Sequence, residues 1–316
     1  MVIQPAAVRS RGGDEEGNVV EKEKKLLGYY PGCELRSRAR ALDISARRAC
    51  QSLGITLKEL KDWTCCGGLV AQVNDNYMAL LAPARVLLGA HAQGFKELVT
   101  LCAFCFNTLR RAAFFLERHP EARRKVATFL EVETLPQVRV LHLLEALRDS
   151  AGFDRIRESV RRPLKGLRVA PYYGCLLLRP AQEIGLDDPE EPTLMEGLLG
   201  ALGCDVVDFR SRTDCCGSYH IVTNQGAAAQ CAQVILHSAA DAKADFLVAS
   251  CPVCQFNLDW SQTGSGNTGM PVVYFPQLLA FALGEPAEAL GFDGKGAAAL
   301  NLSAYAAKEE ALRESS

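Results

Sequence analysis

Ten of the thirteen cysteines in this chain of 316 residues fall into two sets of five with nearly the same spacing. The first set reads Cys33–x31–Cys65-Cys66-Gly67–x34–Cys102-x2-Cys105. The second set reads Cys175–x39–Cys215-Cys216-Gly217–x33–Cys251-x2-Cys254. Thiolates are the soft ligands that bind zinc and iron–sulfur clusters. Each set holds one thiolate more than a tetrahedral zinc ion or a four-cysteine cluster uses. The surplus indicates an unusual metal centre.

The Cys-x2-Cys pairs are typical of metal sites, because a turn of that length points both sulfurs at one ion. Each pair follows an apolar run, at residues 98–101 and 247–250, that is expected to form a strand. A redox dithiol of the thioredoxin type is the alternative, but the Gly-Pro common inside that motif is missing. Three further cysteines stand at set distances from each pair, which favours a metal.

Adjacent cysteines occur once in each set, at Cys65-Cys66 and Cys215-Cys216, and a glycine follows each pair. Neighbouring residues cannot easily place both sulfurs on one tetrahedral centre. They can bind different irons of a larger assembly, or one sulfur can bridge two irons. The glycine permits a sharp turn and a close backbone approach. A vicinal disulfide or two buried thiols is the alternative. Because the pairing recurs, the sequence favours an irregular five-thiolate iron–sulfur cluster in each set.

The composition is that of a globular protein, with 48% hydrophobic and 23% charged residues. A net charge of −2 argues against general affinity for nucleic acid or anionic lipid. The N-terminus has no apolar signal segment, and the longest apolar run, at residues 272–283, is short and contains Pro276. These features predict a cytoplasmic protein with no membrane span, whose cysteines stay reduced.

The similarity between the two halves extends beyond the cysteines. Tyr-Pro-Gly-Cys at 30–33 matches Tyr-Tyr-Gly-Cys at 172–175, and corresponding cysteines lie 142 to 150 residues apart. This period indicates a duplicated domain. The sequence therefore predicts four segments, which are a flexible N-terminal extension at 1–25, a first domain at 26–160, a second domain at 161–285 and a C-terminal tail at 286–316.

Short apolar runs alternate with amphipathic stretches inside each repeat. In the first repeat we expect strands at 26–30, 55–60 and 98–101 and helices at 37–53, 78–92 and 107–118, with Pro83 marking a kink or the true start of the second helix. Alternating strands and helices predict an α/β fold with a small, mostly parallel sheet flanked by helices in each repeat. Ligands gather at the carboxyl ends of such strands, where all five cysteines of a set would lie.

The helices that follow Cys105 and Cys254 would direct their N-termini at the two sites. Unpaired N–H groups and the helix dipole favour negative charge there, and an all-thiolate cluster is anionic. Asn107 and Asn257 follow these cysteines closely and could donate hydrogen bonds to the site. Helix capping would explain both asparagines equally well.

The paired motifs resemble the cysteine-rich subunit of heterodisulfide reductase that is designated B, over roughly residues 25 to 285. More broadly they resemble the Cys-Cys-Gly domain family, which includes subunits of some succinate and fumarate reductases and of lactate or glycolate oxidase systems. Tyr-Tyr-Pro-Gly-Cys at 29–33 and Cys-Cys-Gly-Ser-Tyr-His at 215–220 also fit that resemblance. Both copies are complete here, whereas some relatives have lost cysteines from one copy.

The resemblance implies two noncubane [4Fe-4S] clusters, one per repeat, facing each other across a pseudo-twofold axis. A small-molecule disulfide substrate would be cleaved or formed between them, and single electrons would be pooled into a two-electron step. The implied ligands are all ten cysteines of the two sets: Cys33, Cys65, Cys66, Cys102, Cys105, Cys175, Cys215, Cys216, Cys251 and Cys254.

The chain lacks the ferredoxin run Cys-x2-Cys-x2-Cys-x3-Cys-Pro, which binds cubane clusters. The resemblance therefore implies that electrons come from partners in the same complex. These partners would be a small ferredoxin-like subunit and a flavin-containing subunit.

His220 lies four residues after Cys216 and is a candidate catalytic proton donor to a leaving thiolate, although a structural hydrogen bond would also account for it. No comparable histidine follows Cys66. The remaining histidines are interpreted as one core residue and three surface or helix-end residues, which are His142 and then His91, His119 and His237.

The three cysteines outside the motifs have no histidine at ligand spacing and are expected to be buried free thiols: Cys50, Cys204 and Cys231. Three arginines follow the first cysteine of a set and could meet an anionic substrate or partner, or simply form a solvated helix face: Arg36, Arg38 and Arg179.

Three functions remain open from the residues alone. The favoured hypothesis is the catalytic oxidoreductase subunit of a heterodisulfide-reductase-like complex. The second is a subunit that passes electrons to a quinone or an associated dehydrogenase without chemistry on sulfur. The third is a zinc- or thiol-based scaffold. Cysteine spacing specifies a metal centre and not its substrate.

Overall fold

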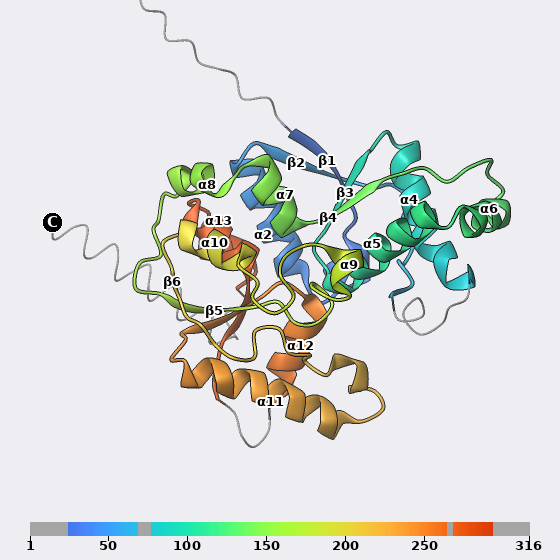
Figure 1. Ribbon diagram of the computed structural model, residues 1–316. Coiled ribbons are helices and arrows are strands. Elements are labelled where there is room, and N and C mark those ends of the chain that lie inside the picture. The colour runs from blue at the N-terminus through green and yellow to red at the C-terminus, as the bar shows by residue number, and fades with distance from the viewer. Residues whose placement is uncertain (1–24, 69–76, 264–267, 293–316) are drawn as a thin grey trace, which may run out of the picture.

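The computed structural model describes residues 25–68, 77–263 and 268–292, and within them two similar α/β units lie side by side (Figure 1). Most of the predicted N-terminal extension and most of the C-terminal tail lie outside the described residues. The part of the tail that is described forms a short 3-10 turn, η3 (Ala287–Leu290), in which Leu290 is fully buried.

Each unit contains a four-stranded sheet in which every pair of neighbours is parallel. The strand orders are equivalent, β2-β1-β3-β4 in the first unit and β6-β5-β7-β8 in the second. The strands are β1 (Lys25–Tyr29), β2 (Ile55–Glu59), β3 (Glu97–Thr100), β4 (Arg139–His142), β5 (Arg168–Tyr172), β6 (Asp205–Val206), β7 (Phe246–Ala249) and β8 (Val272–Tyr274). The predicted fold class, with two small parallel sheets and a repeated architecture, is confirmed.

Helices flank both sheets and connect their strands (Figure 1). The first unit contains α1 (Gly32–Arg36), α2 (Arg40–Ser52), the 3-10 turn η1 (Tyr77–Leu80), α4 (Leu81–Ala92), α5 (Ala103–Arg118), α6 (Pro120–Phe129), α7 (Leu143–Ser150) and α8 (Phe153–Ser159). The second contains α9 (Ala181–Ile184), α10 (Leu194–Ala201), the 3-10 turn η2 (Ser218–His220), α11 (Gln225–Asp241), α12 (Pro252–Trp260) and α13 (Phe275–Ala282).

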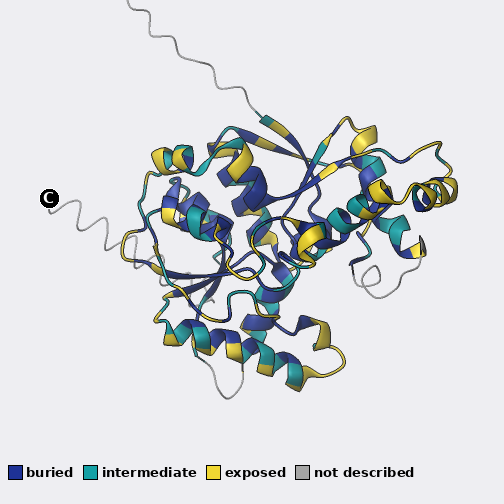
Figure 2. Ribbon diagram, in the orientation of Figure 1, coloured by how far each residue is buried: buried dark blue, intermediate teal, exposed yellow. Residues whose placement is uncertain are grey.

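Burial along the strands follows from the helices on both sheet faces (Figure 2). All four residues of the central strand β7 are buried, and so are the last three of β3. The edge strand β2 instead alternates between buried and exposed positions. Parallel sheets covered on both faces have this near-continuous apolar pattern in their inner strands.

Three local features differ from the sequence-based expectation or resolve it. Helix α5 begins at Ala103 and not at 107, so Cys105 belongs to its first turn. Pro83 lies in the first turn of α4, where a missing N–H costs no helical hydrogen bond, and so it marks the helix start. The arginine-rich stretch at 150–166 contains the short helix α8, whose residue Ile156 is buried.

The helix that directly follows the last strand of each unit packs against the other unit. Helix α13, which follows β8, contacts α2 of the first unit, and α7, which follows β4, contacts α10 of the second. Every residue of α13 is buried. One hydrophobic cluster consequently runs through both units. The two repeats form a single packed body in which each completes the other.

Candidate metal centre

The first five cysteines lie at the edge of the first sheet where the carboxyl ends of its strands meet. β1 and β3 are hydrogen-bonded neighbours, but β1 continues to β2 on one side and β3 to β4 on the other. Crevices form at the carboxyl ends of strands at such a reversal. Cys33 follows β1 there, Cys65 and Cys66 follow β2, and Cys102 follows β3 directly. Parallel pairing places these three chain exits at one edge, as the sequence predicted.

Within the first set the thiols lie in mutual contact. The Sγ atoms of Cys66 and Cys105 are 3.5 Å apart, and Cys102 and Cys105 also share a hydrogen bond. These three cysteines are buried, whereas Cys33 and Cys65 are exposed. The set is therefore a buried group of three thiols with two more at its solvent side.

The second set repeats this arrangement at the ends of β5, β6 and β7. The Sγ atoms of Cys216 and Cys254 are 3.3 Å apart, and Cys251 hydrogen-bonds to Cys254. Cys175 and Cys215 also hydrogen-bond to each other. Cys215 is exposed and Cys175 is half-buried, so the solvent side of this set is the more closed of the two.

Glycines make room for the sulfurs at equivalent positions. Gly32 and Gly174, which precede the first cysteine of each set, have φ of 72° and 66°. A Cβ on Gly32 would lie 2.8 Å from the Cys105 sulfur, closer than atoms can pack. The Cys-Cys-Gly turns use the same left-handed conformation, with φ of 74° at Gly67 and 78° at Gly217. Only glycine adopts this conformation without strain.

Two tyrosines hold the Cys-Cys turns and were given no role by the motif spacing. The Tyr30 hydroxyl donates to the Thr64 carbonyl at 2.8 Å, and the Tyr172 hydroxyl donates to the Asp214 carbonyl at 2.8 Å. Burial and the nearby thiols raise the pKa of both phenols, so both remain donors. The signal was present in the sequence, since a tyrosine stands three residues before Cys33 and before Cys175.

Both Cys-x2-Cys pairs lie at helix N-termini. Cys102 is the N-cap of α5 and Cys251 the N-cap of α12, and neither helix has a side-chain cap hydrogen bond. Unpaired N–H groups therefore point toward the thiols and favour negative charge there. The capping interpretation of Asn107 and Asn257 is consequently wrong.

The two asparagines act as structural donors. Asn257 donates to the Cys216 carbonyl, within its own site. Asn107 donates to the carbonyls of Leu176 and Arg179, at 2.7 Å each, in the segment after Cys175. Asn107 thus joins the first unit to the second.

The two cysteine sets meet between the units. The thiols of Cys102 and Cys251, one from each half, lie close enough to interact, since Cys251 acts to raise the pKa of Cys102 and Cys102 acts to lower the pKa of Cys251. The ring of Phe104, from the first Cys-x2-Cys motif, packs on Tyr219 of the second unit with centroids 5.1 Å apart. A small cavity beside the second set is lined by these rings and by Cys175, Cys251 and other second-unit residues. The structure therefore brings all ten cysteines into two adjoining sites.

Hydrogen bonds between thiols also adjust their acidity. The hydrogen bond with Cys105 lowers the pKa of Cys66 to about 7. In the second set the hydrogen bond with Cys175 lowers the pKa of Cys215 to about 6. Thiolates, and not thiols, bind metal. Each set thus contains at least one cysteine with a pKa near neutral pH, and the pKa values of Cys216 and Cys251 in the second set are lowered as well.

The donor set fits a multi-iron cluster better than a single ion. Among the described residues, no three or more Cys, His, Asp or Glu side chains are arranged to hold one metal ion. The thiols instead form linked pairs spread over buried and exposed positions, with helix N-termini behind them. Each set consists of five cysteine thiols, and cysteine thiolates are the usual ligands of iron–sulfur clusters.

His220 lies beside the second set. It belongs to η2, is exposed to solvent, and its charge acts on the Cys215 thiol. The other histidines lie where the sequence predicted them. His142 is fully buried and caps α7 by accepting from the Leu144 N–H, whereas His91, His119 and His237 are exposed.

The three cysteines outside the motifs have different environments. Cys50 and Cys204 are buried, as predicted, and burial raises the pKa of each to about 12. The expectation was wrong for Cys231, which is only half-buried. It packs behind the second Cys-Cys-Gly turn, where a Cβ on Gly217 would lie 2.8 Å from the Cys231 Cβ.

The arginines after the first cysteines are engaged by the protein. Arg36 forms an ion pair with Glu59, and the Arg38 guanidinium lies 4.6 Å from the ring centroid of Phe256 in the other unit. Arg179 donates to the Thr213 carbonyl and pairs with Glu190. The Arg38 and Arg179 side chains therefore stabilise the segments around the two cysteine sets.

The cysteine-rich domain model, named for its Cys-Cys-Gly motif, matches this chain twice, at residues 27–110 and 169–259. The chain belongs to the Cys-Cys-Gly cysteine-rich domain family. The resemblance stated from the motifs is thereby confirmed, and the two matched segments each span one complete cysteine set.

Two relatives extend the similarity over most of the chain. The 8-methylmenaquinol:fumarate reductase membrane anchor subunit of Wolinella succinogenes is 33% identical, covering 85% of this chain and 96% of its own. The subunit designated B of the ferredoxin/F420H2-dependent CoB-CoM heterodisulfide reductase of Methanosarcina acetivorans is 26% identical, covering 84% and 92%.

A solved structure shares the fold. The crystal structure of a hypothetical protein from Helicobacter pylori superposes with a TM-score of 0.69 at 17% identity. The superposition covers 85% of this chain and 51% of the Helicobacter pylori protein. This chain therefore spans about half the length of that protein. In the described part of this chain, no helix is both long and apolar enough to cross a bilayer.

Proposed function

We propose that this chain is the catalytic iron–sulfur subunit of a heterodisulfide-reductase-like complex. It would be an oxidoreductase acting on sulfur, reducing or forming a disulfide between two noncubane [4Fe-4S] clusters. The contact between the two cysteine sets, through Cys102 and Cys251, is the observation that carries the proposal. Two adjoining metal centres suit a substrate whose two sulfur atoms must be handled together.

The ten motif cysteines would hold the clusters, five to each. When bound, the clusters would supply or accept electrons one at a time. Reduction of a disulfide takes two electrons and two protons and yields two thiols. His220, exposed beside Cys215, would give a proton to one departing thiolate of the substrate. The buried thiols and the Phe104–Tyr219 contact would keep bulk water from the centre.

The partners follow from the same proposal. A small ferredoxin-like subunit would deliver electrons that it takes from a flavin-containing subunit of the same complex. A cytoplasmic location accords with the thirteen cysteines, all of which are free in the structure. The free thiols suit a reducing compartment, where they remain available to metal.

Iron and acid-labile sulfide per chain, measured on anaerobically purified protein, test the cofactor first. Four irons per five-cysteine set predict about eight irons and eight sulfides. Disulfide reduction with a viologen as electron donor then tests the reaction. Zinc without sulfide would refute the cluster proposal, and full clusters without turnover of any disulfide or thiol would refute the reaction.

A second candidate is an electron-transfer subunit that serves a quinone or an associated dehydrogenase. The 33% identical relative is named as belonging to an 8-methylmenaquinol:fumarate reductase, which favours this alternative. Addition of thiols distinguishes the two functions. A thiol substrate would perturb the spectrum of a cluster that works on sulfur and leave that of a pure electron relay unchanged.

A further inference from the structure

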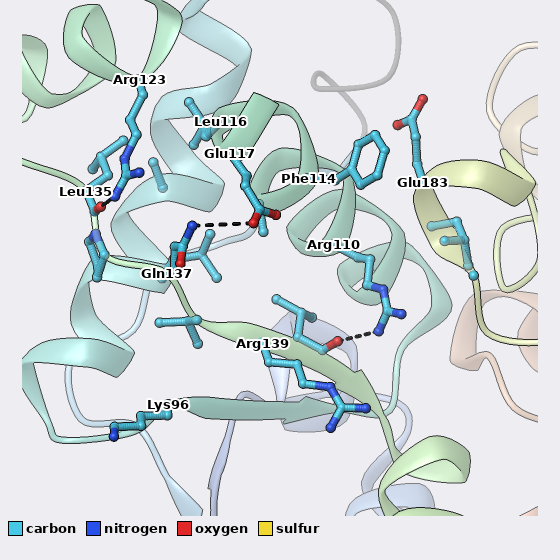
Figure 3. Close-up of a pocket in the computed structure, with 18 of the residues that line it drawn as sticks. Lys96, Arg110, Phe114, Leu116, Glu117, Arg123, Leu135, Gln137, Arg139 and Glu183 are labelled. Atoms are coloured by element: carbon cyan, nitrogen blue, oxygen red, sulfur yellow. Dashed lines mark hydrogen bonds between the residues drawn. The ribbon is translucent and has the colours of Figure 1, made fainter. Parts of the chain in front are cut away.

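A cavity lies away from the cysteines, on the outer side of the first unit. It is a groove of about 550 Å³ bounded by α4, α5, the segment 135–140 and α9 (Figure 3). Its apolar lining includes Leu87, Ala113, Leu116, Leu135 and Ile184. A groove of this size and character suits a ligand or a protein segment.

Charged side chains surround this apolar lining. Arg110, Phe114 and Glu117 come from α5, and Lys96 and Arg123 lie near the groove's other side (Figure 3). Arg110 is neutralised by an ion pair with Glu145, and Arg139 by pairs with three carboxylates. Arg123 donates to the Leu135 carbonyl only, among the hydrogen bonds of the described residues.

The region around the groove is basic, although the chain is not. Residues 81–140 contain nine lysines and arginines and five glutamates, whereas the whole chain has 35 basic and 37 acidic residues. Within the described residues, five cations here have no carboxylate at salt-bridge distance: Arg85, Lys96, Arg118, Arg123 and Arg124. Their positive charge is available to a partner.

Exposed aromatic rings lie on the same helices. Phe115 of α5 and Phe129 of α6 are 36% and 60% exposed. Helix α6 stands at the outer edge of the molecule, beside α5 (Figure 1). We call Lys96, Phe115, Arg118, Arg123, Arg124 and Phe129, with the groove, the α5–α6 surface. Exposed aromatic residues and arginines beside an apolar groove are typical of protein interfaces.

Helix α5 links this surface to the first cysteine set. Its first turn contains Cys105, and its later turns supply Arg110, Ala113, Phe114 and Glu117 to the groove. At a rise of 1.5 Å per residue, Arg110 lies only about 8 Å along the helix from Cys105. A protein bound here would stand close to the first site and remain clear of the small cavity at the second.

We propose that the α5–α6 surface docks an acidic electron-carrying protein, which inserts an apolar side chain into the groove. The charge complementarity argues for this occupant over a neutral one. The proposal rests on the proposed function, because it assigns the entry point of electrons to the first cysteine set. The side of the first set that faces the second set stays free for the substrate.

Electron transfer from a reduced, small acidic ferredoxin to the full-length, cluster-loaded chain tests the docking surface. The probe is a purified two-cluster ferredoxin mixed in a stopped-flow instrument. A Lys96→Glu/Arg124→Glu variant changes two exposed residues without ion pairs in the described part of the chain. We expect its bimolecular rate constant to fall at least about tenfold at low salt, and the difference to shrink at high salt.

Two further variants sharpen the experiment. Lys58→Glu/Arg157→Glu makes the same charge change on β2 and α8 and should keep the rate within about twofold. Phe129→Ser should lower the rate about threefold or more at both salt concentrations, because apolar contacts are not screened. Equal rates for both charge variants, or no transfer to the wild type, would overturn the docking proposal. Disulfide turnover with a viologen bypasses docking, so its failure would identify failure of the proposed function instead.

Discussion

At the scale of single residues, the two sites depend on glycines, which have no side chain, as much as on the cysteine thiols. Gly32 has no side chain where the Cys105 sulfur must lie, and its φ of 72° excludes most other residues. The equivalent Gly174 is less crowded, since a Cβ there would lie 3.2 Å from the Tyr172 hydroxyl oxygen and 3.5 Å from the Cys254 sulfur. The duplication thus provides two equivalent glycine positions that differ in how well they tolerate an added Cβ.

Gly32→Ala should therefore disrupt the first site more than Gly174→Ala disrupts the second. The added methyl displaces the Cys105 thiol, whereas the backbone cost of about 1–2 kcal/mol for a left-handed alanine applies to both positions. We expect about four irons per chain in Gly32→Ala and nearly eight in Gly174→Ala, measured by iron and sulfide analysis. Equal losses in both variants would contradict the steric argument.

His220 offers a residue-scale test of proton supply. His220→Asn removes the proposed acid beside Cys215 and should leave both proposed clusters bound, because the side chain is exposed. General acids contribute about 100-fold or more to such steps. We expect kcat for disulfide reduction to fall by roughly that factor, with KM and iron content little changed. A His237→Asn variant, also exposed but remote from the motifs, is the control.

The stability of the folded chain should depend on pH through His142. Burial lowers its pKa from 6.5 to about 4, and the neutral ring accepts from Leu144 N–H while its other nitrogen lies 3.3 Å from the Leu101 carbonyl oxygen. Between these two pH values the unfolded chain binds a proton that the folded chain does not. Stability should therefore fall on acidification from pH 6.5 toward 4, by about 1.4 kcal/mol per pH unit.

Thermal unfolding of anaerobic protein at pH 7 and pH 5.5 measures this linkage. His142→Asn can still cap α7 but does not titrate, so its Tm should drop less between the two pH values than that of the wild type. An equal drop would show that other groups dominate the acid sensitivity.

At the scale of elements, the two Cys-x2-Cys helices reach into opposite units. Asn107 of α5 is fully buried and donates to two carbonyls after Cys175, while Phe256 of α12 receives the Arg38 guanidinium over its ring. Each helix thus carries its cysteines at one end and a contact to the other repeat in its next turn. The elements that position the thiols also fix the distance between the sites.

Asn107→Ala should loosen this junction. It leaves two buried carbonyls without their donor, which costs about 1–3 kcal/mol. We expect Tm to fall by several degrees and disulfide turnover to fall more than iron content does. Thr108→Val is the neighbouring control, because the Thr108 hydroxyl is buried without a partner among the described residues and its loss should cost little.

At the scale of the whole molecule, the contacts of α7 and α13 with helices of the opposite repeat make the repeats interdependent. All eight residues of α13 are buried, and its partner α2 belongs to the other repeat. Residues 26–160 expressed alone should accordingly expose the α2 face and fail to unfold cooperatively or bind iron. Co-expression with residues 161–292 should restore both properties, as measured by thermal unfolding and iron analysis. A first repeat that binds about four irons by itself would contradict this interdependence.

The sequence alone determined the two sets of five cysteines and predicted the repeated α/β units. These features are local, because a strand followed by a short turn delivers Cys33 or Cys102 to the sheet edge whatever the rest of the chain does. The start of α5 was misplaced, since Ala103 to Phe106 are apolar residues that suit a strand continuation as well as a first helical turn. The surface position of Cys231 was also missed, because it depends on how α11 packs behind a distant turn.

Only the tertiary structure decided how the two sites meet. The Cys102–Cys251 contact, the bonds from Asn107 and the exchange of α7 and α13 all join residues far apart in the chain. The basic groove likewise combines α4, α5 and α9 from both repeats. Spacing and periodicity report which face of an element is apolar, but not which other element covers it. That choice is made by packing across the whole molecule.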